Sequence, residues 1–182
     1  MFTAFLYNEI FFNMRYFFAL ITFFGLCIGA QGQVITDFPV DSSVIKEFER
    51  RVKLTRIEGK YIPKDLNDAI AELNKIMEDG AKKKFKEMSE DNARRKTHFS
   101  FGKYINARWH IQDGSRLTLW FQSNKIYNTD DMIDCIIATY HRSLNNQPLQ
   151  FEQLAEYYFK KQKEKVDKLV KKKAEQSKSR QK

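Results

Sequence analysis

The side chains best suited to acid–base chemistry lie between His98 and His141. Asp134 and His141 are seven residues apart, so in a helix they lie on one face, two turns from each other. His98 could join them only through tertiary packing. One hypothesis is therefore a small hydrolase, with His98 or His141 as the acid–base group and Asp131 or Asp134 orienting the ring. The alternative is that each histidine lies at the edge of the core and bonds a backbone group or a carboxylate.

The spacing of these residues predicts neither a metal site nor a cofactor. None of the three histidines, His98, His110 and His141, has a second histidine or cysteine four residues away, as a helical zinc site requires. No glycine-rich phosphate loop is present. Ser115 lacks the G-x-S-x-G context of a nucleophilic serine, and its position before Arg116 is typical of a helix cap. We interpret Cys135 as a buried, inert thiol.

Two tryptophans and two arginines are the candidates for binding: Trp109, Trp120, Arg116 and Arg142. Exposed together, they would present aromatic rings and guanidinium groups to a carboxylate or a phosphate. The structural interpretation places the tryptophans in the core. It pairs the arginines with the neighbouring acidic residues Asp130–Asp131, which would set how two helices dock.

The elements that must position these side chains are predicted to be helices. Only seven glycines and three prolines interrupt the chain, and apolar residues recur at helical spacing. We therefore expect an all-α, compact bundle of about five to six helices. The predicted helices span residues 41 or 42 to about 59, 63 to 80, 89 to 109, 115 to 124, 128 or 129 to 145, and about 149 into the tail. A lysine-rich turn is predicted at 81–88. The last helix is expected to fray beyond Lys171.

An apolar run near the start of the chain predicts export. Tyr16–Ala30 spans 15 residues, fewer than the roughly 20 needed to cross a bilayer, and Arg15 precedes it. Small residues at Ala30 and Gly32 predict cleavage before Gln33, so residues 1–32 would be a signal peptide, with Met14 as the true start. The protein would then be periplasmic or secreted. The alternatives are an uncleaved membrane anchor and a lipid attached to Cys27.

The net charge of +9 is concentrated at the C-terminus. Residues 160–182 hold 11 Lys or Arg against 3 Asp or Glu, whereas residues 33–159 hold 20 against 19. A nucleic-acid-binding domain would carry its basic residues on the folded face, so we expect no nucleic-acid partner. The expected organisation is a lead and first helix (33–60), a helical domain (61–159) and a lysine-rich tail (160–182). The tail is either a solvated helix or a cationic segment that contacts anionic lipid or another polyanion.

A series of short motifs resembles a known bacterial family. The order IPKDLNDAIAELNKI, MSED, HF, W, GSRL, DDM and YHRSLN, over Tyr61 to Tyr158, is similar to a domain of unknown function found in exported or envelope-associated proteins. The resemblance implies one compact helical domain and no known activity. Members typically read W-G-L-W before GSRL, where this chain has Trp109-His110-Ile111-Gln112.

Together these features predict an exported, non-enzymatic domain that binds a macromolecule of the cell envelope. The predicted surface lies around Trp109, Arg116, Arg142 and Trp120, and its partner would be an envelope protein. The tail would add a weak contact with an anionic membrane. The alternatives are the small hydrolase, and a structural spacer whose polyanion-binding tail alone makes the contact. The sequence predicts no oligomeric state.

Overall fold

The computed structural model describes residues 42–180, and side chains up to residue 177. These residues belong to one compact unit that begins at Ser42. The described chain is mostly α-helical with a single two-stranded sheet, which confirms the predicted fold class. The predicted signal peptide, the start at Met14, the lipidation alternative at Cys27 and the lead after Gln33 lie outside the described residues.

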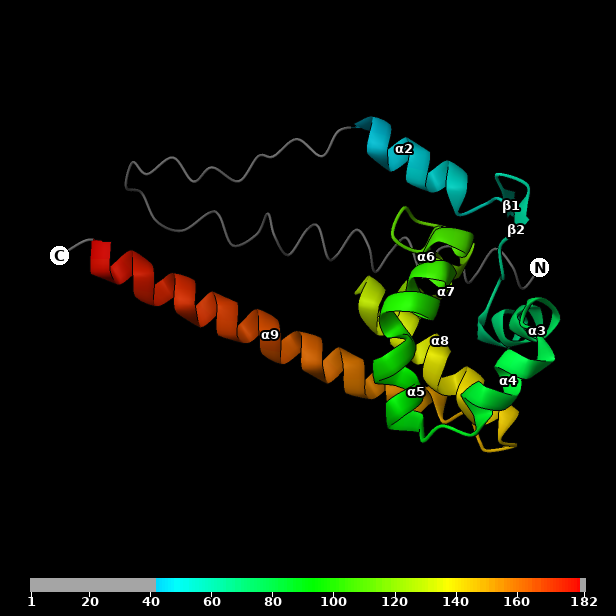
Figure 1. Ribbon diagram of the computed structural model, residues 1–182. Coiled ribbons are helices and arrows are strands. Elements are labelled where there is room, and N and C mark those ends of the chain that lie inside the picture. The colour runs from blue at the N-terminus through cyan, green and yellow to red at the C-terminus, as the bar shows by residue number, and fades with distance from the viewer. Residues whose placement is uncertain (1–41, 181–182) are drawn as a thin grey trace, which may run out of the picture. The chain divides into compact units, whose positions relative to one another are not determined.

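The elements follow one another through short connections (Figure 1). In chain order they are α2 (Ser42–Arg51), β1 (Arg56–Ile57), β2 (Lys60–Tyr61), α3 (Leu66–Ile76), α4 (Asp79–Lys86), α5 (Glu90–Thr97), a π-helical turn (His98–Gly102), α6 (Lys103–Trp109), α7 (Arg116–Ser123), α8 (Thr129–Leu144) and α9 (Phe151–Arg180).

Helix α8 is the centre of the core. It packs against α3, α4, α5, α9 and the π-helical turn, and Figure 1 shows α3 and α4 toward one side of it and α5 toward the other. Its residues from Ile136 to His141 are all buried. Nine of the sixteen residues of α8 are buried, and they include an unbroken run from Cys135 to His141 that covers every side of the helix. This broad buried surface agrees with its central place in the core.

Polar caps fix where several helices begin, as the sequence predicts. Ser89 accepts a hydrogen bond from the backbone of Asn92 at the start of α5. Ser115 and Thr118 form a reciprocal capping box on α7. Asn128 accepts from the amides of Asp130 and Asp131 at the start of α8. These bonds satisfy amide groups that have no partner inside the helix, so each start position is specified locally.

A short hairpin replaces the end of the predicted first helix. Arg56 pairs with Tyr61 and Ile57 with Lys60 in antiparallel register. The two turn residues, Glu58–Gly59, have φ angles of 49° and 74°, which is the geometry of the tight turns that match strand twist. The expectation that helix would reach Gly59 was wrong, because α2 ends at Arg51 and the chain then reverses direction through this turn.

The second predicted helix is divided into two. Helix α3 begins after Asp65, whose side chain accepts from the Asp68 amide, so Pro63 lies before the helix rather than in its first turn. It ends at Ile76, and Gly80 belongs to α4 instead of terminating α3. The predicted lysine-rich turn is α4, which buries only Phe85. Its lysines are good helix formers, and one aromatic contact holds them to the core.

The predicted long helix from Ser89 is interrupted by the π-helical turn. Gly102 lies against α8: a Cβ placed there would come within 2.8 Å of Ile133. The wider turn also separates two aromatic residues, since Phe101 packs on the Phe85 ring at 5.7 Å whereas Phe99 is 77% exposed. π-helical turns occur mostly as single-turn insertions of this kind inside α-helices.

Helix α6 ends in a left-handed residue. His110 has φ 50° and ψ 44°, a region that glycine adopts freely and that other residues occupy at a cost.

Helix α9 continues to Arg180. The expected fraying beyond Lys171 was wrong, because lysine, glutamate, glutamine and alanine all have high helix propensity and neither glycine nor proline interrupts this segment.

Candidate functional site

Asp134 lies in a network that joins three helices. Its carboxylate accepts a hydrogen bond from Arg94 Nε of α5 at 3.0 Å, a second from the Arg94 guanidinium and one from the Tyr158 hydroxyl of α9. Arg94 also donates to Tyr158 at 3.1 Å. Asp134 was a candidate for orienting a catalytic histidine. In the structure its oxygens are held by Arg94 and Tyr158.

The electrostatics of this network keep Asp134 ionised. Burial acts to raise the pKa of Asp134, but hydrogen bonds from Arg94 and Tyr158 outweigh it, and the pKa lies below its ordinary value. Burial and the bond to Asp134 raise the pKa of Tyr158. The bond from the guanidinium to Asp134 raises the pKa of Arg94. The network is therefore an ion pair with a neutral phenol at neutral pH, suited to holding helices together.

His141 is buried against a backbone carbonyl. Its Nε2 is 2.8 Å from the Met88 carbonyl oxygen, and because a carbonyl only accepts, Nε2 carries the proton. The ring packs edge-on against Phe85 at 5.7 Å. This is the arrangement that the structural alternative for the histidine predicts.

His98 is the first residue of the π-helical turn and lies near the start of α8. Its Nε2 is 3.7 Å from Asp130, whereas Asp131 accepts a 2.8 Å hydrogen bond from Lys161 of α9. Within the described chain no hydrogen bond, ion pair or ring contact joins His98 to His141. The structure therefore does not bring the four acid–base candidates together as one group.

Both candidate arginines bind partners other than the predicted Asp130–Asp131 pair. Arg142 donates two hydrogen bonds to Glu90 of α5, at 2.8 and 2.7 Å, and one to the Leu149 carbonyl. The bond from Arg142 is the main cause that lowers the pKa of Glu90. Arg142 thus joins α5 to α8 as a two-pronged fork.

Arg116 takes part in a second cluster, at the hairpin. It donates to the Ile62 carbonyl at 2.7 Å and lies over the Tyr61 ring at 5.1 Å. The prediction that the arginines pair with Asp130–Asp131 was wrong, since residues distant in sequence supply the acceptors.

The predicted aromatic surface is not present among the described residues. Trp109 is fully buried, so its side chain has no exposed face. Trp120 is half-buried and packs on Phe151 of α9, with ring centroids 4.8 Å apart. Cys135 is buried, and burial raises the pKa of its thiol to about 12. The core interpretation of Trp109 and Cys135 is confirmed.

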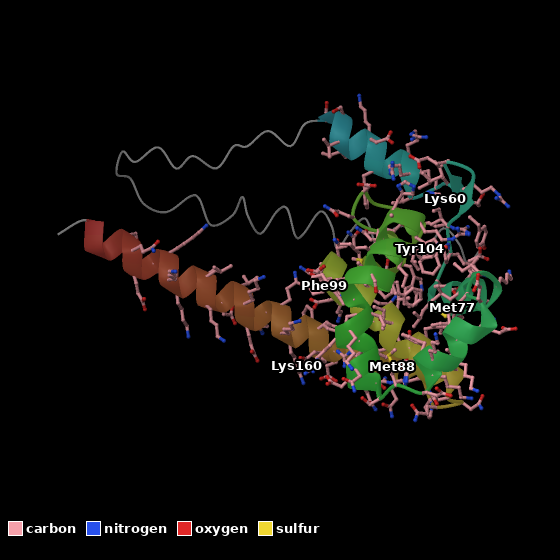
Figure 2. The ribbon with its side chains drawn as sticks, in the orientation of Figure 1. Lys60, Met77, Met88, Phe99, Tyr104 and Lys160 are labelled. Carbon is pink, nitrogen blue, oxygen red and sulfur yellow. The ribbon has the colours of Figure 1, made fainter. Side chains whose placement is uncertain are left out.

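The outer part of α9 is an exposed helical segment of the described chain. Its first turns are held to the body by Phe151, Leu154, Tyr158 and Lys161. From residue 163 to residue 177 every side chain is exposed. Figure 2 labels Lys160 near the place where the helix leaves the body. The positive charge of this segment could be read from the sequence. The contacts that anchor α9 to the body could not, because they are made with residues distant in the sequence.

One side of this outer helix is apolar. Residues three or four apart in a helix lie on the same face. This spacing connects Tyr158, Gln162, Val166 and Leu169, so their side chains share one face of α9. Val166, Leu169 and Val170 are 50%, 52% and 60% exposed. We call these three residues the α9 stripe. It continues the side on which α9 packs against the body, but no part of the described chain covers it.

Residues 42–180 contain neither a candidate membrane-spanning helix nor a candidate metal site. No helix there is both long and apolar enough to traverse a bilayer. Nor do three or more metal-ligating side chains gather anywhere in that range.

The comparisons with known proteins agree with the helical core. Residues 62–144 match the model of a family described as Domain of unknown function (DUF6794), which confirms the resemblance noted in the sequence. No curated protein and no solved structure matches the chain. The match begins at Ile62, directly after the hairpin, and ends at Leu144, the last residue of α8. Residues 62–144 of this chain are therefore similar to this family of domains of unknown function, and α2 and α9 lie outside the match.

Proposed function

We propose that this protein is a non-enzymatic binding module of the cell envelope, and that its outer α9 helix docks on the surface of an anionic membrane. The observation that carries the proposal is an exposed apolar stripe on the most basic segment of the chain. The helical body holds α9 and orients it.

Charge and exposure of α9 support an anionic partner. Residues 160–182 carry 11 basic against 3 acidic side chains, and the described side chains from 163 to 177 are all exposed. Lysines near an anionic lipid surface each contribute about 1 kcal/mol of binding. Several lysines acting together give an attraction that depends steeply on salt.

The α9 stripe favours lipid over a polyanion without an apolar phase. Helices that lie in the membrane interface combine a basic face with an apolar face that enters the boundary between headgroups and acyl chains. Val166, Leu169 and Val170 supply that apolar face, and Lys163 and Lys165 lie at its margins. A nucleic acid or a polysaccharide would be bound by the lysines alone.

The engagement of the acid–base candidates supports a non-enzymatic role. Asp134 is held by Arg94 and Tyr158, and His141 by the Met88 carbonyl. These contacts hold Asp134 and the Nε2 atom of His141 within the fold. Location in the envelope is supported by the apolar run Tyr16–Ala30, whose length suits an export signal.

Vesicle cosedimentation tests this function on the full chain. We expect binding to vesicles containing phosphatidylglycerol and little binding to pure phosphatidylcholine. The charge variant K168Q/K171Q/K172Q should bind roughly a hundredfold more weakly, because three lysines contribute about 3 kcal/mol. The stripe variant V166S/L169S/V170S should also bind weakly at unchanged charge.

The matched control is K83Q/K84Q/K86Q, which removes the same charge from the exposed face of α4. It should bind anionic vesicles about as well as the parent chain. If the control loses binding as the charge variant does, the attraction is diffuse and α9 is not the binding element. If the stripe variant binds as the parent does while the charge variant fails, the partner is a polyanion bound by charge, and the membrane proposal is wrong.

A further inference from the structure

A basic cleft lies on the body, between the hairpin, α3 and α6. It has a volume of about 460 Å³ and is lined by Arg56, Lys60, Tyr61, Glu72, Lys75 and Arg108, together with the Gly59 backbone. Figure 2 shows Lys60 on the hairpin and Tyr104 on α6, the elements that border it. Clefts of a few hundred Å³ are large enough to hold small ligands.

The lining has an excess of positive charge. Four of its side chains are basic and one, Glu72, is acidic. Glu72 is shared by two of the cations: Arg108 Nη2 is 3.5 Å from it and Lys75 Nζ is 3.6 Å from it. Both distances exceed those of a direct hydrogen bond. Glu72 therefore leaves most donors of the cleft without an acceptor.

Arg108 carries a specific unused donor. Its Nε is buried and has no hydrogen-bond partner within the described chain, although Arg108 lines the cleft. A buried donor without an acceptor costs free energy, but this atom has almost no accessible surface, so it does not itself open into the cleft. Guanidinium groups bind phosphate oxygens through two parallel N–H donors, of which Nε–H is commonly one.

The hairpin fixes the other side of the cleft. Arg56 Nη1 donates to the Gly59 carbonyl at 2.9 Å, which holds the guanidinium beside the turn. The Tyr61 hydroxyl donates to Asp68 at 2.7 Å and orients the ring at the floor. Lys60 is exposed and makes no ion pair within the described chain. The hairpin thus presents two cations to the cleft, and Arg56 is held in place by its bond to the turn.

From the cleft and the excess of four basic over one acidic side chain in its lining, we infer that this site binds a phosphate monoester group. A carboxylate carries one negative charge, whereas a phosphate monoester carries up to two and presents three acceptor oxygens to converging donors. The group can belong to a soluble small molecule or to a lipid headgroup. The inference does not depend on the proposed role of α9, because the two surfaces have no residue in common.

Titration of the full chain with glycerol 3-phosphate, followed by backbone amide NMR, tests the site. We expect saturable shifts of the Gly59, Lys60 and Tyr61 amides at millimolar ligand, about the affinity of a few charged contacts. Acetate at the same ionic strength should not cause them. The variant R56Q/K60Q should weaken binding about tenfold or more, since it removes two charged donors.

The matched control is K83Q/K84Q, which removes two exposed charges from α4 and should leave the affinity within about twofold of the parent. The variant R108K keeps the charge but removes the planar guanidinium group, and should weaken binding severalfold. Arg56 and Lys60 are exposed, so R56Q/K60Q keeps the test valid if R108K does not fold. Absence of saturable hairpin shifts, equal shifts with acetate, or equal weakening by both double variants would overturn the inference.

Vesicles distinguish the two sources of the group. Phosphatidic acid presents a monoester and phosphatidylglycerol a diester. This comparison uses the α9 stripe variant. If it binds phosphatidic acid vesicles more strongly than phosphatidylglycerol vesicles, and R56Q/K60Q removes the difference, the group belongs to a lipid headgroup. If it binds glycerol 3-phosphate but does not prefer phosphatidic acid vesicles, the group belongs to a soluble ligand. Failure of α9 to bind vesicles leaves the glycerol 3-phosphate result unaffected, so the two proposals fail separately.

Discussion

Tyr158 of α9 donates a hydrogen bond to Asp134 of α8, and this bond fixes the start of the exposed helix on the core. Replacing Tyr158 by Phe removes the hydroxyl and keeps the ring. We expect the free energy of unfolding to fall by about 1 kcal/mol. Asp134→Asn should cost more, roughly 3 kcal/mol, because it leaves the part-buried Arg94 with only the more distant Glu90, 4.0 Å away, as a counter-charge. Urea unfolding followed by circular dichroism measures both, and equal stability of Y158F and parent would show that the bond has no net effect.

Acid should destabilise the fold through two carboxylates. The pKa of Asp134 is lowered by Arg94 and Tyr158 against the opposing effect of burial, and the pKa of Glu90 is lowered mainly by Arg142. Because the pKa of each carboxyl group is lower in the folded state, the unfolded chain binds protons at a higher pH than the folded chain does. The stabilisation is therefore complete above the pKa values of the unfolded chain, about 3.9 for aspartate and 4.3 for glutamate. The stabilisation is lost as the pH falls from these values through the lower pKa values of the folded chain. Urea midpoints should be lower at pH 3 than at pH 5 or 7, and the decrease should be smaller in D134N.

Cys135 should resist thiol reagents while the protein is folded. Burial raises the pKa of its thiol to about 12, so little thiolate exists at pH 8 and the reagent has no access. Labelling with a disulfide reagent should follow the unfolding rate and become rapid in urea. The parent and Y158F make an informative pair, because the variant should label faster. Rapid labelling of the native parent would contradict this account.

Two glycines should respond in opposite ways to alanine. Gly114 has φ 85°, and a Cβ there would lie 2.4 Å from the Phe48 ring of α2. Gly114→Ala should therefore lower stability by about 2 kcal/mol, through backbone strain and displacement of the ring. A methyl group at Gly80, in α4, would meet no other part of the described chain within 4 Å, so Gly80→Ala should be neutral or slightly stabilising. Thermal melts of both variants compare them directly.

Export makes a separate prediction for the first residues of the chain. If Tyr16–Ala30 acts as a cleaved signal, protein recovered from the envelope or the medium should begin at Gln33. N-terminal sequencing measures this. Full-length material in the cytosol would contradict the proposal of an envelope location.

Local features of the fold were predictable because they are encoded within a few residues. Ser89 and Ser115 were identified as helix caps from residue type and position alone, and the structure confirms both. For α8 the sequence left Asn128 and Thr129 open, and the structure shows Asn128 as the cap. The hairpin was missed because its strands have only two residues each, too few for an alternating pattern. The π-helical turn was missed because its cause is the close approach of Gly102 to Ile133, a contact distant in sequence.

The candidate site was harder to predict, because its contacts are tertiary. The sequence placed Asp130–Asp131 near the arginines, but Arg142 pairs with Glu90, 52 residues away, and Arg116 with Ile62, 54 residues away. A carboxylate nearby in sequence is a weak guide when the chain turns between elements. The basic cleft shows the same limitation, since its cations come from three elements and form no run in the sequence.

The unbroken path of α9 has a mechanical consequence. At 1.5 Å per residue its 30 residues extend about 45 Å, and the same rod is clamped at one end by Tyr158 and Lys161. Because α9 has no hinge, its outer part and the body keep a fixed relative orientation. The angle between the outer part of α9 and a bound surface therefore also determines the orientation of the body. Attachment by α9 would then determine which side of the body is presented to other molecules.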